Sequence, residues 1–133
     1  MPSIKHICLS DLHLGAPTSL LTDTPGVGDG AYCAISAKDL RDAFSAAFVA
    51  TLAALNKGNN PADAPCIVLM GDIFDLSLGT PRLAIDAFDA LLKSLADAGA
   101  RDQVGQFVFV PGNHDHELWT ATRFHNMVGA STA

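Results

Sequence analysis

The sequence predicts an α/β domain built on a mostly parallel sheet, with the element order β-α-β-α-β. Three apolar runs of strand length alternate with two segments of helical periodicity, and this alternation is typical of parallel strands joined by helical crossovers. Each apolar run is followed directly by a short polar cluster. Because parallel strands bring their carboxyl ends to one edge of a sheet, we expect the three clusters to meet at that edge.

The three strands are expected at residues 4–10, 66–70 and 106–110, where apolar residues follow one another over strand length. Turn-forming residues border each of these runs, which favours short strands over buried helical segments. The second run contains no polar residue. We therefore expect this strand to be covered on both faces of the sheet.

Two amphipathic helices are predicted between the strands. The first covers residues 37–56, where apolar side chains recur every three or four residues behind an N-cap at Ser36. The second begins at Thr80–Pro81, where threonine caps the helix and proline fits its first turn. Residues 11–36 are expected to include a long loop rich in proline and glycine, and a last short helix is expected at residues 116–127.

The composition restricts the class of protein. The chain has 133 residues, of which 49% are hydrophobic and 17% are charged, and this fits one folded domain better than a disordered chain. The formal net charge is −6 and the eight basic residues are scattered, so no basic nucleic-acid-binding patch is expected. We find no signal peptide, no membrane span and no paired cysteines, and therefore expect a reducing, cytoplasmic location.

The first two polar clusters offer carboxylate and imidazole groups at the ends of their strands. Asp11 and His13 are two residues apart, so both side chains leave the strand end on the same side and can hold one metal ion. Asp72 follows Gly71, which permits a tight turn, and its carboxylate is placed to bridge two cations. Asp75 is expected to accept a hydrogen bond from a ligand such as His13. The alternative for both clusters is a set of surface turn residues.

The third cluster, Gly112–Asp115, is the most specific of the three. The carbonyl oxygen of Asn113 is a neutral metal ligand. His114 stands beside Asp115, and a carboxylate that orients an imidazole is typical of acid-base catalysis. The alternative is a turn with solvated side chains. Mixed nitrogen and oxygen ligands at the three strand ends favour Mn²⁺, Fe²⁺ or Zn²⁺ over Ca²⁺.

These residues resemble the calcineurin-like metallophosphoesterase superfamily, whose signature runs Asp-x-His, then Gly-Asp-x-x-Asp, then Gly-Asn-His-Asp. The strings Leu9–Gly15, Met70–Asp75 and Val110–Asp115 are similar in particular to two branches. These branches are the UDP-2,3-diacylglucosamine hydrolases with their relatives and the nuclease subunits of double-strand-break repair. The resemblance implies an α/β/β/α sandwich, of which this chain supplies the β-α-β-α-β half.

The resemblance also implies a dinuclear centre of divalent metal ions that activates a water molecule to hydrolyse a phosphoester. By this resemblance, Asp11 and His13 would bind the first ion and Asp72 would bridge both ions. Asn113 would bind the second ion. His114, with Asp115 as its partner, would be the catalytic residue at the phosphate. Asp75 orients a ligand in this scheme. The substrate class, whether monoester, diester, pyrophosphate or nucleic acid, is not identified by the sequence.

Members of this superfamily carry further histidine ligands in a second half. Residues 1–133 are therefore expected to form a single, incomplete domain whose second metal site lacks ligands. Without that half, one apolar face of the sheet is expected to be exposed and available for dimerisation or for pairing with another chain. The alternative function is a truncated, non-catalytic binding or interaction module that retains the sheet.

Overall fold

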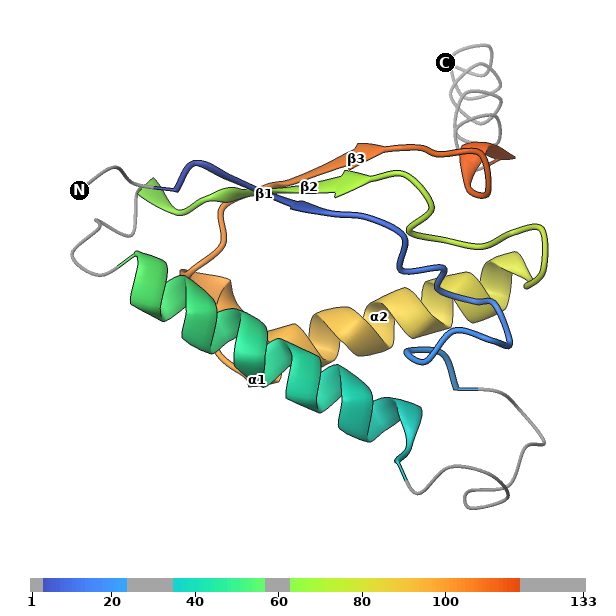
Figure 1. Ribbon diagram of the computed structural model, residues 1–133, viewed down its shortest axis with the longest axis horizontal. Coiled ribbons are helices and arrows are strands. Elements are labelled where there is room, and N and C mark those ends of the chain that lie inside the picture. Colours follow the sequence, from blue (N-terminus) through green and yellow to red (C-terminus); the bar gives the residue numbers. More distant parts are fainter. Residues whose placement is uncertain (1–3, 24–34, 57–62, 118–133) are drawn as a thin grey trace, which may run out of the picture.

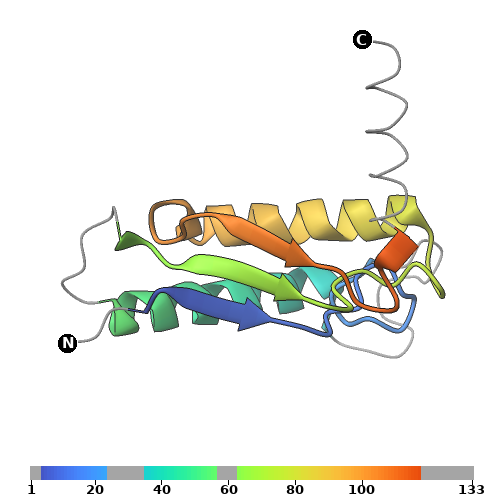
Figure 2. The same ribbon diagram turned by 90° about the horizontal axis from the view of Figure 1, so that it is seen from above.

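The computed structural model describes residues 4–23, 35–56 and 63–117 and confirms the α/β class. Three strands lie side by side in one parallel sheet in the order β1-β2-β3, as Figure 2 shows from above. The elements in chain order are β1 (His6–Leu9), α1 (Ala37–Leu55), β2 (Cys66–Met70), α2 (Pro81–Asp97), the short 3-10 helix η2 (Ala100–Asp102) and β3 (Phe107–Val110).

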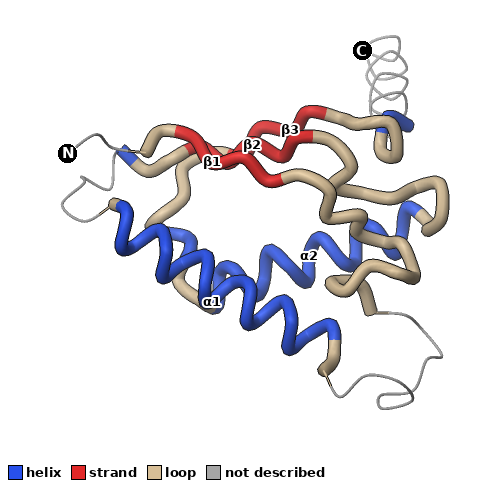
Figure 3. The backbone as a smooth tube through the Cα atoms, in the orientation of Figure 1, coloured by secondary structure: helices blue, strands red, loops and turns tan. Residues whose placement is uncertain are grey.

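Both long helices pack on the same face of the sheet (Figures 1 and 3). The register aligns Ile7 with Ile67 and Ile67 with Phe107, so these three side chains share one face. Ile67 is 1% exposed, which identifies this as the face that the helices cover. The hydrophobic core lies between that face and the helices, and its buried members are Leu14, Ile67, Leu69, Ile73, Phe74, Ala84, Ala87, Leu91, Leu95 and Ala100.

The prediction that the second strand is covered on both faces is wrong for the described residues. Ile67 and Leu69 are buried against the helices, but Met70 is 48% exposed. Val68 aligns with Val108 on the opposite face, and Val108 is 40% exposed. A continuous apolar run predicts two covered faces only where both layers are present, and the described residues supply one layer. An exposed apolar face of the sheet, which the resemblance implied, is present.

Both helix starts lie where the capping residues predict them. Ser36 Oγ accepts a hydrogen bond from the Asp39 amide at 3.1 Å, and the Asp39 carboxylate accepts one from the Ser36 amide at 3.2 Å. This reciprocal pair is a capping box, which satisfies two amides that the first turn leaves free. Thr80 Oγ1 accepts from the Leu83 amide at 3.2 Å, and Pro81 occupies the first turn of α2. The sequence signals for both helix starts are therefore confirmed.

Gly15 brings the segment after β1 against the start of α2. Its φ angle is +96°, and a Cβ atom at this position would lie 2.8 Å from the backbone of Ala84. Glycine is required here both for the left-handed conformation and for the close approach. A Cβ atom on Gly79 would in turn meet the carbonyl oxygen of Gly15. The two glycines allow the segments after β1 and β2 to pack tightly where the polar clusters lie.

Two predicted segments lie partly outside the described residues. Of the long segment 11–36, residues 11–23 are described and contain turns but no helix or long strand. The helix predicted at residues 116–127 begins with His116 and Glu117, which are helical, and its remainder lies outside the described residues. Within the described part of the chain, no helix has the length and apolarity needed to cross a membrane.

Candidate metal centre

Backbone hydrogen bonds hold the three polar clusters side by side at the carboxyl edge of the sheet. The amide of Asp11 donates to the carbonyl of Gly71 at 3.2 Å, and the amide of His13 donates to the carbonyl of Asp72 at 2.9 Å. The amide of Gly71 donates to the carbonyl of Val110 at 2.7 Å. The parallel pairing thus continues past the ends of the strands and carries the polar side chains with it.

Asp11, His13 and Asp72 form the first group of converging side chains. Each offers one carboxylate oxygen or ring nitrogen, and these atoms all lie within 4.8 Å of one another. Nε2 of His13 is 3.8 Å from Oδ1 of Asp11. Asp11 is exposed and the other two residues are half-buried, so the group is open to solvent. Carboxylate and imidazole groups at these separations are suited to holding a divalent metal ion.

The same three residues have left-handed backbones. The φ angles are +55° at Asp11, +47° at His13 and +52° at Asp72, and no other non-glycine residue in the described ranges has a positive φ. This region is uncommon for non-glycine residues, although Asp and His are enriched among those that adopt it. Such conformations cluster at binding and catalytic sites. Their coincidence with the converging side chains makes this edge of the sheet the candidate functional site.

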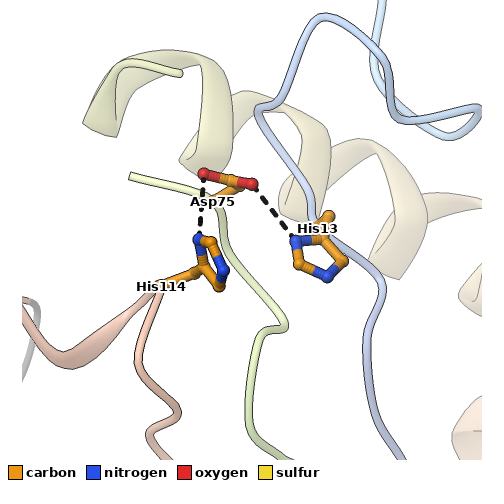
Figure 4. Close-up of side chains that lie close together, drawn as sticks. All are labelled: His13, Asp75 and His114. Carbon is orange, nitrogen blue, oxygen red and sulfur yellow. Dashed lines mark hydrogen bonds and ion pairs between the residues drawn. The ribbon is translucent and has the colours of Figure 1, made fainter. Parts of the chain in front are cut away.

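Asp75 orients the ring of His13. Its carboxylate is 2% exposed, and Oδ2 accepts a hydrogen bond from Nδ1 of His13 at 3.1 Å (Figure 4). The other oxygen, Oδ1, accepts from the Ser77 amide at 3.1 Å, the Ser77 hydroxyl at 2.8 Å and the Leu78 amide at 3.0 Å. Because Nδ1 of His13 faces Asp75, Nε2 is the ring nitrogen that faces Asp11 and is available to a metal ion.

His114 contacts Ser77, a residue that none of the three sequence motifs contains. Nδ1 of His114 lies 2.9 Å from the Ser77 hydroxyl and 3.7 Å from Oδ1 of Asp75, so Asp75 lies between the two imidazoles (Figure 4). Ser77 has one hydroxyl proton and donates it to Asp75, so its oxygen accepts from Nδ1 of His114. The only sequence signal was a serine two residues after an aspartate, which is a common turn pattern.

The partners of Asp115 differ from the one that the sequence suggested. Asp115 is fully buried, and its Oδ2 accepts hydrogen bonds from the amides of Ile73 at 2.9 Å and Phe74 at 3.4 Å. Its Oδ1 accepts from the amide of Gly112. This carboxylate ties the segment after β2 to the segment after β3. The ring of His114 instead takes the serine and aspartate partners described above.

Asn113 lies against the carboxylate of Asp72. With its amide nitrogen turned toward Asp72, it donates to the two carboxylate oxygens at 3.1 and 3.2 Å. In the other orientation the amide oxygen of Asn113 faces the carboxylate oxygens of Asp72, and all of these atoms are acceptors. A cation placed between the two side chains would be coordinated by oxygens from both. The amide of His114 also donates to Oδ1 of Asp72 at 3.1 Å. Asp72 is therefore shared between the first group and Asn113.

Asp75 is ionised throughout the neutral range. Burial by itself raises the pKa of this carboxyl. The hydrogen bonds from the Leu78 amide, the Ser77 hydroxyl and His13, together with the nearby His114, outweigh burial and lower the pKa to about 2. An ionised carboxylate can only accept hydrogen bonds, so Nδ1 of His13 is the donor in this pair.

We expect the metal-free protein to lose stability as the pH falls from about 4 toward about 2. An aspartate in the unfolded chain has a pKa of about 3.9, and the folded value for Asp75 is about 2. The ionised form therefore stabilises the fold above the unfolded pKa, by about 2 to 3 kcal/mol, and this contribution is lost as the pH falls through the folded pKa. Urea unfolding across this pH range measures the effect.

The control for this experiment is a pair of variants. Asp75→Asn is expected to show a shallower loss of stability with falling pH, whereas Asp89→Asn, at an exposed position of α2, is expected to follow the wild type. An Asp75→Asn variant with the wild-type pH dependence would contradict the interpretation.

The fold and the site define an α/β protein with a carboxylate and imidazole centre at the carboxyl edge of a parallel sheet. The sequence model of the calcineurin-like phosphoesterase family matches residues 4–130. The chain therefore belongs to the calcineurin-like phosphoesterase family, which confirms the superfamily that the three motifs predicted. Neither the curated proteins nor the solved structures include a significant match to the chain.

Proposed function

We propose that the chain hydrolyses phosphoesters with two divalent metal ions at the carboxyl edge of the sheet. The observation that carries the proposal is the convergence of Asp11, His13 and Asp72, whose ligand atoms lie within 4.8 Å of one another, in a chain of the calcineurin-like phosphoesterase family. The shared position of Asp72, between this group and Asn113, supports a bridging role for its carboxylate.

In this proposal Asp11, His13 and Asp72 hold the first ion, and Asp72 and Asn113 hold the second. When bound, such ions would polarise the phosphate and lower the pKa of a bound water molecule. Mn²⁺, Fe²⁺ and Zn²⁺ are the metals that the mixed nitrogen and oxygen ligands favour. Among the described residues the second position has only two protein ligands, so we expect it to bind its ion more weakly.

The remaining residues of the site position these ligands and move protons. Asp75 fixes the ring of His13 through Nδ1, and Ser77 fixes the ring of His114 through its Nδ1. Nε2 of His114 is then the nitrogen that can exchange a proton with a leaving oxygen or donate to the phosphate. We propose that Asp115 acts through the backbone amides it binds, rather than as the partner of the imidazole.

A metal titration combined with a hydrolysis assay tests the proposal. Calorimetric titration of the metal-free chain with Mn²⁺ is expected to show one tight and one weak site, and hydrolysis of an aryl phosphodiester is expected to require the metal. Asp11→Asn is expected to lose the tight site and the activity, and Asp89→Asn is expected to keep both. Absence of Mn²⁺ binding, or full activity in Asp11→Asn, would refute the proposal.

A non-catalytic interaction module is the second candidate, and the exposed outer face of the sheet favours it. Val68, Met70 and Val108 lie on that face, where the described residues provide no second layer. We propose that a second copy of the chain is the partner in that case. This candidate predicts one weakly bound ion, no turnover, and a dimer in sedimentation that Val108→Lys dissociates. A monomeric chain that hydrolyses phosphoesters would exclude it.

A further inference from the structure

A pocket with a volume of about 370 Å³ adjoins the proposed metal ligands Asp11 and His13. This volume lies in the range of pockets that bind small molecules. The remaining lining residues come from the segment after β1, and they are Leu12, Thr18, Ser19, Leu20 and Leu21. The described lining thus includes three leucines and two hydroxyl-bearing residues beside the proposed metal ligands.

The wall of this pocket is held to the end of β1 by side-chain hydrogen bonds. Thr22, which is 6% exposed, accepts a hydrogen bond from the Gly15 amide at 2.9 Å. The hydroxyl of Ser19 donates to the carbonyl of Leu12 at 3.1 Å. Because both bonds join the wall to the segment that carries Asp11 and His13, the pocket keeps its position relative to the proposed metal ligands.

A buried arginine of α1 holds the other end of the wall. Arg41 is 5% exposed, and it donates to the carbonyl of Leu21 at 3.0 Å and to the carboxylate of Asp23 at 2.9 Å. The guanidinium is engaged behind the wall and does not line the pocket. The pocket is thus formed by packing and hydrogen bonds on both sides of Leu20.

The exposure of Leu20 and the charged residues of the lining indicate which kind of substrate group the pocket accepts. Leu20 is 72% exposed although its neighbour Leu21 is half-buried, so an apolar side chain is presented to solvent beside the metal centre. Among the described residues that line the pocket there is no lysine or arginine, and the one carboxylate is that of Asp11. An anionic group placed here would meet no cationic side chain among the described lining residues, whereas an apolar group would bury leucine surface.

We propose that this pocket holds an uncharged apolar group esterified to the substrate phosphate, so that the enzyme acts on phosphate esters of hydrophobic alcohols. This inference rests on the proposed phosphoesterase function for the position of the phosphate. It disfavours nucleotide pyrophosphates and nucleic-acid backbones, whose further negative charges would enter a pocket whose described lining residues include no cationic side chain.

Binding of phosphonates to the Mn²⁺-loaded chain tests the inference without any need for turnover. Three ligands are compared by calorimetry, namely methylphosphonate, hexylphosphonate, and a phosphonate of hexyl length that ends in a carboxylate. Each buried methylene contributes roughly fourfold in affinity, so hexylphosphonate is expected to bind at least about tenfold more tightly than either of the others. Equal affinities for the methyl and hexyl ligands would overturn the inference.

Two leucine variants test whether the preference for hexylphosphonate arises in this pocket. Leu20→Ser is expected to reduce the preference for hexylphosphonate over methylphosphonate to about threefold or less. Leu55→Ser removes a leucine that is 56% exposed at the end of α1, outside the pocket, and is expected to keep the wild-type preference. A preference that survives Leu20→Ser would assign the apolar group to another surface and overturn the inference.

Hydrolysis of two diesters separates this inference from the proposed function. p-Nitrophenyl hexyl phosphate and p-nitrophenyl methyl phosphate share a leaving group, so a difference in KM reports the pocket rather than the chemical step. Hydrolysis of both with equal KM would overturn the pocket and leave the phosphoesterase function intact. A binding preference without hydrolysis of either would support the pocket and refute the phosphoesterase function.

Discussion

Asp72→Asn is expected to lower metal-dependent hydrolysis by a factor of at least about 100, because among the described residues only Asp72 lies both in the group with Asp11 and His13 and against Asn113. Changes to residues that merely orient a ligand already cost about 10 to 100-fold, so the loss of a bridging carboxylate is expected to cost more. The asparagine keeps the side-chain volume and an oxygen that can accept from the His114 amide, which Asp72 binds at 3.1 Å. The charge is what the substitution removes.

The measurement combines steady-state hydrolysis of an aryl phosphodiester with calorimetric titration of Mn²⁺. Asp89→Asn makes the same chemical change on the exposed surface of α2 and is expected to behave as the wild type in both. Urea unfolding of the metal-free variants controls for a folding defect. Wild-type activity together with wild-type Mn²⁺ stoichiometry in Asp72→Asn would refute the bridging role.

Asp115→Ala is expected to lower the free energy of unfolding by about 3 kcal/mol or more. The carboxylate of Asp115 accepts hydrogen bonds from the amides of Ile73, Phe74 and Gly112, and it is fully buried. Each buried amide left without an acceptor costs about 1 to 3 kcal/mol, and hydrogen bonds to a charged acceptor lie at the upper end of this range. Urea unfolding at neutral pH measures the loss.

The same variant distinguishes the two roles considered for Asp115. A residue that acts on the imidazole of His114 would lower activity and leave stability nearly unchanged, whereas a residue that joins the segments after β2 and β3 lowers stability first. Asp86→Ala removes an exposed carboxylate of α2 and is expected to change stability by less than about 0.5 kcal/mol. A similarly small change in Asp115→Ala would contradict the structural role.

The elements of the fold follow from local patterns and were predictable for that reason. Ser36 and Thr80 predict the helix starts, because N-capping depends only on residues within one turn of the helix. The order of apolar and amphipathic segments predicted the parallel sheet. The environment of β2 was not predictable in the same way, since burial of its outer face depends on a layer that the described residues do not contain.

The gathering of the polar clusters was also predictable in outline. Asp11, His13 and Asp72 follow strands that are neighbours in a parallel sheet, so their convergence follows from topology alone. The proximity of Asp75 to His13 required one further assumption, that a carboxylate one turn beyond a ligand points back toward it. The structure brings these two side chains to 3.1 Å.

The partners of Ser77, Asp115 and Leu20 could not be read from the sequence. A carboxylate next to a histidine accepts equally well from an imidazole or from backbone amides, and the path of the loop decides between them. Ser77 meets His114 across 37 positions of the chain, and no local pattern indicates such a contact. The pocket at Leu20 depends on Arg41, which reaches the loop from α1.

The left-handed backbones of Asp11, His13 and Asp72 carry an energetic cost that belongs to the folding of the chain. Such conformations cost on the order of 1 to 3 kcal/mol each. The backbone hydrogen bonds that join the amides of Asp11 and His13 to the segment after β2 offset part of this cost. In the proposed metal centre, ligands ordered by folding in this way would bind a cation at a smaller entropic cost.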